Sequence, residues 1–170
     1  YEDTLLHLAV KKENLDIVKL LLERTDIDQN KVNKDKDTLL HLAVKKGNLD
    51  IVKLLLEKTD IDPNKVNQND DTLIHLAAKG GYFDIVKLLL EQTDIDPNKV
   101  NKEGDSPLHS AAESGNIAIV KLFLEKTDID VNMLNKSGNN TLHSAIKYGR
   151  LNIVQLLLDR TDIDPNKVNE

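Results

Sequence analysis

The chain of 170 residues contains no cysteine and no tryptophan, and its only other aromatic residues are three Tyr and two Phe. Without cysteine, these residues can form no disulfide bond, thiolate nucleophile or cysteine-ligated zinc site. No run of about eighteen apolar residues occurs, so no membrane insertion is expected. No segment resembles a basic, apolar secretory signal. These absences favour a reducing compartment, and we expect a cytoplasmic protein.

Charge of one sign is not concentrated anywhere in the sequence. Charged residues make up 31% of the chain, the formal net charge is −6, and lysine accompanies the acidic residues throughout. A protein that binds nucleic acid usually carries a basic stripe that neutralises phosphates. We therefore expect no nucleic acid as a principal partner.

An internal repeat is the dominant feature of what is present. The five histidines, His7, His41, His75, His109 and His143, are spaced by 34 residues, and residues 3–36 match residues 37–70 at 28 of 34 positions. A fixed period of this size indicates stacked supersecondary units rather than one globular core. The repeats divide the single array 1–170 at approximately 3–36, 37–70, 71–104, 105–138 and 139–170.

The second repeat illustrates the structure expected of one unit. Thr38 can cap a short first helix, which Gly47 ends, and apolar residues at helical spacing predict a second helix from about Leu49 to Glu57. The remainder, 59–70, is rich in Asp, Asn and Pro and predicts a turn with an extended hairpin. Each unit therefore consists of two helices and a finger, and the chain is predicted to be an all-α repeat solenoid.

The repeated motifs resemble the ankyrin repeat. Its Thr-Pro-Leu-His tetrapeptide, alanine pair and glycine turn are best matched by SPLHSAAESGN at 106–116, followed by IVKLFLE at 119–125 and DVN at 130–132. The resemblance covers essentially the whole chain and implies the ankyrin-type fold, with stacked helix pairs and projecting fingers. Tetratricopeptide repeats share the 34-residue period, but their longer helices leave no room for a polar finger of about twelve residues.

Departures from the family pattern have structural consequences. At the second position of the tetrapeptide, proline stands only at Pro107, so the other first helices must rely on Thr or Asn capping. The fingertip glycine survives as Gly104 and Gly138, whereas Lys36 and Asp70 occupy the earlier equivalents. We expect those two fingertips to be more strained or differently shaped.

The histidines are predicted to be structural rather than chemical. Successive repeats lie roughly 10 Å apart, too far for neighbouring histidines to share a metal. The resemblance implies that the Thr and His of the tetrapeptide bond to each other and to the adjacent finger. The structural candidates are Thr4, His7, Thr38, His41, Thr72, His75, Ser106, His109 and His143.

No motif predicts a catalytic residue, a cofactor or a metal site. Asp60, Asp62, Asn64 and Asp71 imitate four ligand positions of an EF-hand loop, but Lys65 stands where that loop requires glycine. No nucleophile beside a base and no phosphate-binding glycine loop stands out. We therefore expect neither an enzyme nor a calcium-binding protein.

The resemblance implies a protein-protein interaction module whose partner lies along a concave surface of fingertips and first helices. The candidate contacts are Lys34, Asp35, Asp37, Lys45, Lys46, Gln68, Asn69, Asp71, Lys79, Lys102, Glu103, Asp105, Glu113, Ser114, Met133, Lys136, Ser137, Asn139, Lys147 and Tyr148. In the first two repeats the alternative, simple solvation, is favoured, and Lys45→Ala is expected to be neutral for folding. The last two repeats differ most from the others. Met133 and Tyr148 could therefore either anchor a partner or fill a gap.

The end repeats keep apolar faces typical of interior repeats. Solenoids generally need polar capping repeats, so we expect a segment of a longer array, most simply monomeric, with end-to-end association as the alternative. The functional alternatives are a structural spacer, a self-associating segment or a consensus-like engineered repeat protein. Arrays of similar composition suggest, by analogy, a host-directed protein of an intracellular microbe.

Overall fold

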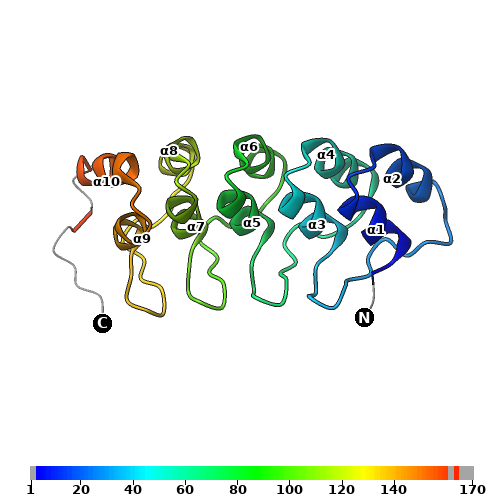
Figure 1. Ribbon diagram of the computed structural model, residues 1–170, viewed down its shortest axis with the longest axis horizontal. Helices are drawn as coiled ribbons and strands as arrows, with labels where there is room; N and C mark the ends of the chain where they lie inside the picture. The colour runs from blue at the N-terminus through cyan, green and yellow to red at the C-terminus, as the bar shows by residue number, and fades with distance from the viewer. Residues whose placement is uncertain (1–2, 161–162, 165–170) are drawn as a thin grey trace.

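The computed structural model describes residues 3–160 and 163–164, and the helices in this part form five consecutive pairs. In Figure 1 the first helices of the pairs form an inner row, the second helices form an outer row above it, and the connecting loops project below as fingers. The inner helices are α1 (Leu5–Lys11), α3 (Leu39–Lys46), α5 (Leu73–Gly80), α7 (Pro107–Ser114) and α9 (Thr141–Lys147). The outer helices are α2 (Leu15–Leu22), α4 (Leu49–Lys58), α6 (Phe83–Gln92), α8 (Ile117–Lys126) and α10 (Leu151–Leu158).

Side-chain caps determine where the inner helices begin. In α3 the Thr38 side chain accepts a hydrogen bond from the His41 amide at 3.3 Å, and His41 Nδ1 accepts one from the Thr38 amide at 3.2 Å. This reciprocal capping box satisfies two amides that a helix start otherwise leaves unpaired. Asn140 caps α9, and Pro107 occupies the first position of α7, as predicted.

A left-handed residue separates the two helices of a pair. Gly47 ends α3 with a φ of 70°, and Asn48 then caps α4 by accepting from the Ile51 amide at 3.0 Å. In the first repeat Glu13 stands in place of this glycine and adopts a φ of 56°. Only two residues therefore separate α3 from α4, which brings their apolar faces together.

Apolar side chains are buried between neighbouring repeats rather than around one centre. Leu40, Val44, Val52 and Leu55 are all fully buried. Each inner helix packs against the next one along the row, and each outer helix does the same. The all-α repeat solenoid predicted from the sequence is thus confirmed.

The fingers are built from turns, and no strand occurs in residues 3–160 or 163–164. The extended hairpin expected from the sequence is reduced to a tight turn around one asparagine. The side-chain oxygen of Asn33 accepts from the Asp35 and Asp37 amides, both at 2.9 Å, and the Asn33 amide donates to the Asp37 carbonyl at 3.1 Å. Local bonds of this kind replace the ladder of a hairpin.

The end of the outer helix also follows from local chemistry. Thr59 follows α4 in an extended conformation, and its hydroxyl donates to the Leu55 carbonyl at 2.6 Å. Threonine thereby closes the helix. None of the helices in the described ranges combines the length and the apolar character needed to cross a bilayer.

Candidate functional site

The histidines fasten each inner helix to its own cap and, in the middle of the array, to the next finger. His75 Nδ1 lies 2.8 Å from the Thr72 hydroxyl, and His75 Nε2 lies 2.9 Å from the Asp105 carbonyl. His109 makes the equivalent contacts with Ser106 at 2.8 Å and with the Asn139 carbonyl at 3.0 Å. Each ring therefore links two consecutive repeats.

Burial disfavours the charged form of these rings. Burial is the largest cause of the lowered pKa of His7, His41, His75 and His109. Nearby hydrogen-bond acceptors and carboxylates act in the opposite direction. The Nε2 atoms of His7 and His41 are buried and have no partner that meets the geometry of a hydrogen bond. The nearby backbone of Asp37 and Asp71 still favours the protonated ring and so partly opposes the lowering of the pKa. Within the described residues, no three potential ligands among His, Asp and Glu gather as a metal site would require.

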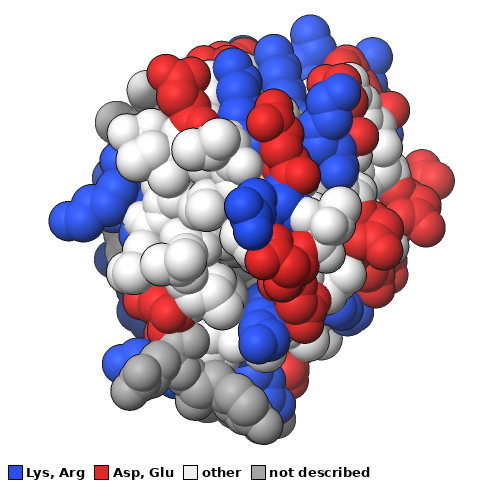
Figure 2. Space-filling view, turned by 90° about the vertical axis from the view of Figure 1, so that its right-hand side faces the viewer, with Lys and Arg blue, Asp and Glu red and all other residues white. Residues whose placement is uncertain are grey.

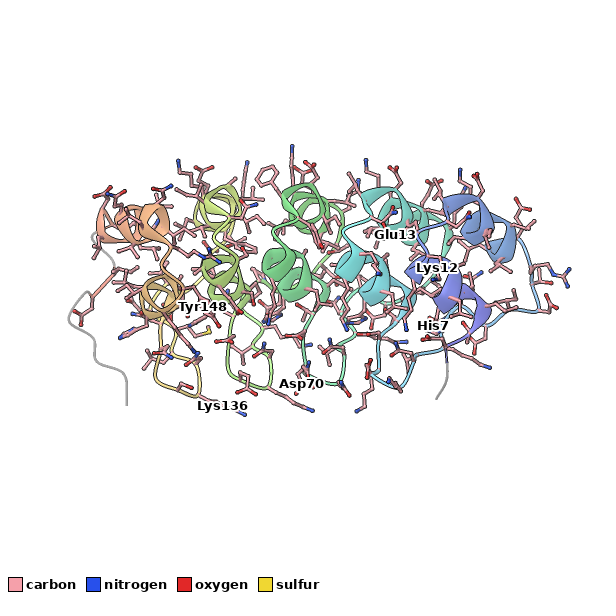
Figure 3. All side chains as sticks on the ribbon, in the orientation of Figure 1. His7, Lys12, Glu13, Asp70, Lys136 and Tyr148 are labelled. Atoms are coloured by element: carbon pink, nitrogen blue, oxygen red, sulfur yellow. The ribbon has the colours of Figure 1, made fainter. Side chains whose placement is uncertain are left out.

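The fingertips are joined to one another by backbone hydrogen bonds. The Gln68 amide donates to the Asp35 carbonyl at 2.8 Å, and the Lys102 amide donates to the Asn69 carbonyl at 2.9 Å. The Lys136 amide completes the series by donating to the Glu103 carbonyl at 2.9 Å. Asp70 and Lys136 mark two of these fingertips at the lower edge of Figure 3. The fingertips therefore form one continuous edge along the array.

The aspartates at the bases of the fingers serve mainly as internal acceptors. Asn101 donates to the Asp71 carboxylate at 2.9 Å, and Asn135 donates to the Asp105 carboxylate at 2.7 Å. Asp37 is buried, and both of its oxygens accept from Lys45 Nζ at 2.7 Å. Burial removes Asp37 from any contact with a partner, so its role is to hold the helix end against the finger.

The other candidate residues lie on the fingers or on the C-terminal turns of the inner helices, and we call the surface of these two parts the finger-side surface. The Lys45–Asp37 pair connects these two parts within a repeat. Exposed side chains on this surface are Lys34, Lys45, Lys46, Gln68, Asn69, Lys79, Lys102, Glu103, Lys136, Ser137, Lys147 and Tyr148. Half-buried candidates are Asp35, Asp71, Asp105, Glu113, Ser114, Met133 and Asn139.

Glu113 and Tyr148 bring two successive repeats into contact at the C-terminal end of this surface. The Glu113 charge is the main cause that raises the pKa of the Tyr148 phenol, and Lys147 Nζ lies 5.6 Å from the centre of the Tyr148 ring. Lys79 Nζ is 3.9 Å from the Glu113 carboxylate. Tyr148 remains exposed beside the inner row (Figure 3). It is thus an aromatic side chain available to a partner.

Sequence reasoning did not single out Arg150. Its guanidinium donates from Nε and Nη2 to the Glu113 carbonyl at 3.0 and 2.8 Å, which joins the end of α7 to the start of α10. A signal was available, because arginine stands where the second and fourth repeats have the capping residues Asn48 and Asn116. The bond fixes the backbone of Glu113, and with it the C-terminal part of the finger-side surface.

The four residues that imitate an EF-hand do not gather at one site. Asp60 accepts from Asn30 at 3.1 Å, the Asp62 carboxylate accepts from the Asn64 amide at 2.8 Å, and Asn64 donates to Asp94 at 2.8 Å. The Asn30–Asp60 and Asn64–Asp94 bonds join the loops after successive outer helices. The fourth residue, Asp71, is instead bonded to Asn101 in the next finger.

Comparison with known families agrees with this architecture. A family model described as ankyrin repeats (three copies) matches residues 6–101 and again residues 74–169. The two matches overlap and together span nearly the whole chain. No individual curated protein was found to match it.

Proposed function

The chain belongs to the ankyrin-repeat family, and we propose that it is a protein-binding module whose partner lies along the finger-side surface. Ankyrin repeats are generally protein-interaction modules, and proteins built from them are typically non-enzymatic scaffolds. We propose no catalytic residue, no cofactor and no nucleic-acid partner. Function in such an array depends on the particular side chains that its surface presents.

The observation that carries the proposal is the difference between buried and exposed positions of the repeat. Equivalent core positions carry the same or nearly the same residue type in successive repeats. One example is the buried set Ile51, Ile85, Ile119 and Ile153. In contrast, the two residues at the C-terminal turn of the inner helix are Lys-Lys in the first two repeats. They change to Lys79-Gly80, Glu113-Ser114 and Lys147-Tyr148 in the last three. The folding requirement is thus common to all repeats, whereas the finger-side surface is alike in the first two repeats and changes in each of the last three.

The C-terminal part of this surface is the best candidate for the centre of an interface. Partly exposed aromatic side chains frequently supply much of the binding energy, whereas lysine contributes less. Tyr148 provides such a side chain, and the Glu113 carboxylate beside it adds a charge that would select the partner. Hydrogen bonds from Arg150 hold this region in place before binding.

The cellular setting of the proposal is the cytoplasm of the source cell, or of a host cell if the protein is exported. The absence of cysteine supports a reducing compartment. The host-directed role follows only from the analogy of composition with arrays of intracellular microbes.

A pull-down from lysate of the source or host cell tests the proposal. The parent chain is compared with a variant that carries Glu113→Lys and Tyr148→Ala, and we expect specific proteins to be retained by the parent and lost by the variant. A variant with Glu125→Lys on the exposed side of α8 makes the same charge reversal away from the finger-side surface. It should retain the same proteins as the parent.

Folding of each variant is checked by its thermal melting curve. If the folded double variant retains the same proteins as the parent, the assignment of this surface fails. If the parent retains no protein specifically, the function of a structural spacer becomes the better explanation.

A further inference from the structure

At the fingertips and at the C-terminal turns of the inner helices, the exposed charges are mostly those of lysines. The fingertips are residues 33–37, 67–71, 101–105 and 135–139, all of which the structure describes. In these described fingertips and helix turns, Glu103 is the only exposed carboxylate. Asp37 is buried, and the half-buried carboxylates are Asp35, Asp70, Asp71, Asp105 and Glu113. A partner that approaches these parts therefore meets ammonium groups before carboxylates.

The lysines of the first three repeats lie close to one another. Packing of α1 against α3 and of α3 against α5 brings the ends of these helices side by side, and backbone hydrogen bonds join the fingertips. The Lys45–Asp37 ion pair, at 2.7 Å, links a helix end to a fingertip. We call the surface formed by six exposed lysines of this region the lysine surface. Its members are Lys12, Lys34, Lys36, Lys46, Lys79 and Lys102.

The lysine surface is available to a partner. Lys12 and Lys46 take part in no ion pair within residues 3–160 and 163–164. Lys12 stands at the end of α1, and Glu13, the carboxylate that follows it, lies closer to the outer row (Figure 3). The surface ends at Glu113, whose carboxylate lies 3.9 Å from Lys79 Nζ.

The acidic residues gather on the other side of the helix pairs. Two or three residues join the helices of a pair, so the helices run antiparallel, and the loops after the outer helices lie opposite the ends of the inner helices. Each of the first four of these loops exposes two aspartates, as Asp60 and Asp62 illustrate. Figure 2 looks at the end of the array formed by the first repeat, and acidic side chains predominate along its right-hand side. The net charge of −6 is therefore not spread evenly, and the lysine surface is basic by comparison.

The arrangement of the repeats sets the spacing of the charges that match the lysine surface. Successive repeats lie roughly 10 Å apart, as packed helices do, and an extended chain advances about 3.3 Å per residue. One carboxylate at about every third residue therefore keeps pace with one lysine-bearing repeat. The joined fingertips form a continuous edge that an extended segment can follow across all three repeats.

Closely spaced phosphates match this surface less well than separated carboxylates. A DNA duplex carries one charge for about every 1.7 Å of its length. Asp35 lies between Lys34 and Lys36, and its carboxylate would repel a continuous row of phosphates. Arginine, whose planar group binds phosphate through two parallel hydrogen bonds, is not among the six residues. The surface thus favours an acidic protein segment over a nucleic acid.

We propose that the lysine surface binds an extended acidic segment of the partner protein, with a carboxylate at about every third residue. This inference rests on the proposed function and names the chemistry of the partner at one part of the same site. Complementary charge fixes register and speeds association more than it adds affinity. Tyr148, beyond the end of the lysine surface, then supplies the aromatic contact, so the two parts of the finger-side surface have different tasks.

Fluorescence anisotropy with a peptide of five Glu-Ser-Gly units, labelled with an electrically neutral dye, tests the proposal. The parent should bind this peptide at about 20 mM salt and more weakly at about 0.15 M salt, because salt screens exposed charges. A peptide with glutamine in place of every glutamate should not bind. A peptide of the same composition with its glutamates placed together should bind less tightly, since it matches a single repeat.

Charge reversal on the protein locates the binding surface. Lys12→Glu together with Lys46→Glu should weaken binding of the Glu-Ser-Gly peptide by at least about tenfold, because attractive pairs become repulsive ones. Lys19→Glu together with Lys53→Glu makes the same change on α2 and α4 of the same two repeats, and this control should bind like the parent. All four lysines are exposed, and thermal melting confirms that both variants fold.

A labelled DNA duplex and the pull-down complete the test. The duplex should bind more weakly than the Glu-Ser-Gly peptide at about 0.15 M salt, and the peptide should displace the proteins that the parent retains from lysate. The proposal is overturned if the parent does not bind the peptide, if the two double variants bind it equally, or if the clustered peptide or the duplex binds as tightly. Specific retention that the peptide does not displace would refute the acidic segment and leave the proposed function standing.

Discussion

At the scale of single residues, the fingertips show how one backbone requirement is met by different amino acids. Gly104 and Gly138 adopt φ values of 77° and 70°, whereas Lys36 and Asp70 adopt 57° and 60° at the equivalent positions. Left-handed backbone places Cβ close to the following carbonyl, which costs roughly 1–2 kcal/mol for an ordinary L-residue. The strain expected from the sequence at these two positions is thus visible in their dihedral angles.

We predict that Lys36→Gly stabilises the protein by about 0.5–1 kcal/mol, because the strain relieved at positive φ exceeds the entropy that glycine adds to the unfolded chain. Chemical denaturation measures the change in the free energy of unfolding. Lys34→Gly lies in the same turn without positive φ and should destabilise the protein slightly. Equal destabilisation by both substitutions would contradict the explanation.

At the scale of elements, an ion pair joins the end of each of the first two inner helices to the aspartate just before the cap of that helix. Lys45 pairs with Asp37 at 2.7 Å, and Lys11 pairs with Asp3 at 2.7 Å. The Asp37 side chain is almost fully buried, so its charge depends on this lysine for compensation. The sequence alone predicted that Lys45→Ala would be near neutral for folding, whereas this geometry predicts a loss of stability.

Lys45→Ala should lower the free energy of unfolding by about 1–3 kcal/mol, since it leaves a buried carboxylate without its cation. The adjacent Lys46 is exposed, and Lys46→Ala should change stability by less than about 0.5 kcal/mol. Urea denaturation of the two variants provides the comparison. If the two substitutions have the same effect, the ion pair does not contribute as the structure implies.

At the scale of the whole molecule, four buried histidines recur along the array and respond to pH in the same direction. Burial lowers the pKa of His7, His41, His75 and His109 in the folded protein. As pH falls below about 6.5, the unfolded chain therefore binds protons that the folded chain does not. The contribution of these histidines to the free energy of unfolding is fully present above this pH, and it is lost as pH falls towards and through their folded pKa values.

We predict that the melting temperature falls between pH 7.5 and pH 5, a range above the ordinary titration of Asp and Glu. Each fully shifted histidine contributes up to about 1.4 kcal/mol per pH unit within its window. His75→Gln should reduce the slope of stability against pH, whatever its effect on stability at pH 7.5. A melting temperature that does not change over this range would contradict the prediction.

The sequence by itself determined the repeat, the helix pairs and most helix boundaries. These depend on short-range features, such as the spacing of apolar residues, the Thr38 cap and the Gly47 turn, which are present within each 34-residue unit. The second helix of the template was predicted to end at Glu57 and ends at Lys58, one residue later. The family resemblance then supplied the finger-side surface as a set of positions.

Only the tertiary structure decided which of those positions offer a side chain to a partner. Asp37 is buried and forms an ion pair with Lys45. Asp71 and Asp105 accept hydrogen bonds from asparagines of the next finger. Arg150 donates to the backbone carbonyl of Glu113 in the preceding repeat. The sequence could not decide this, because these contacts join residues brought together by stacking, and hydrogen bonding and burial depend on that three-dimensional environment. The same physical reason makes equivalent residues, such as Leu5 and Leu39, exposed at an end and buried inside the array.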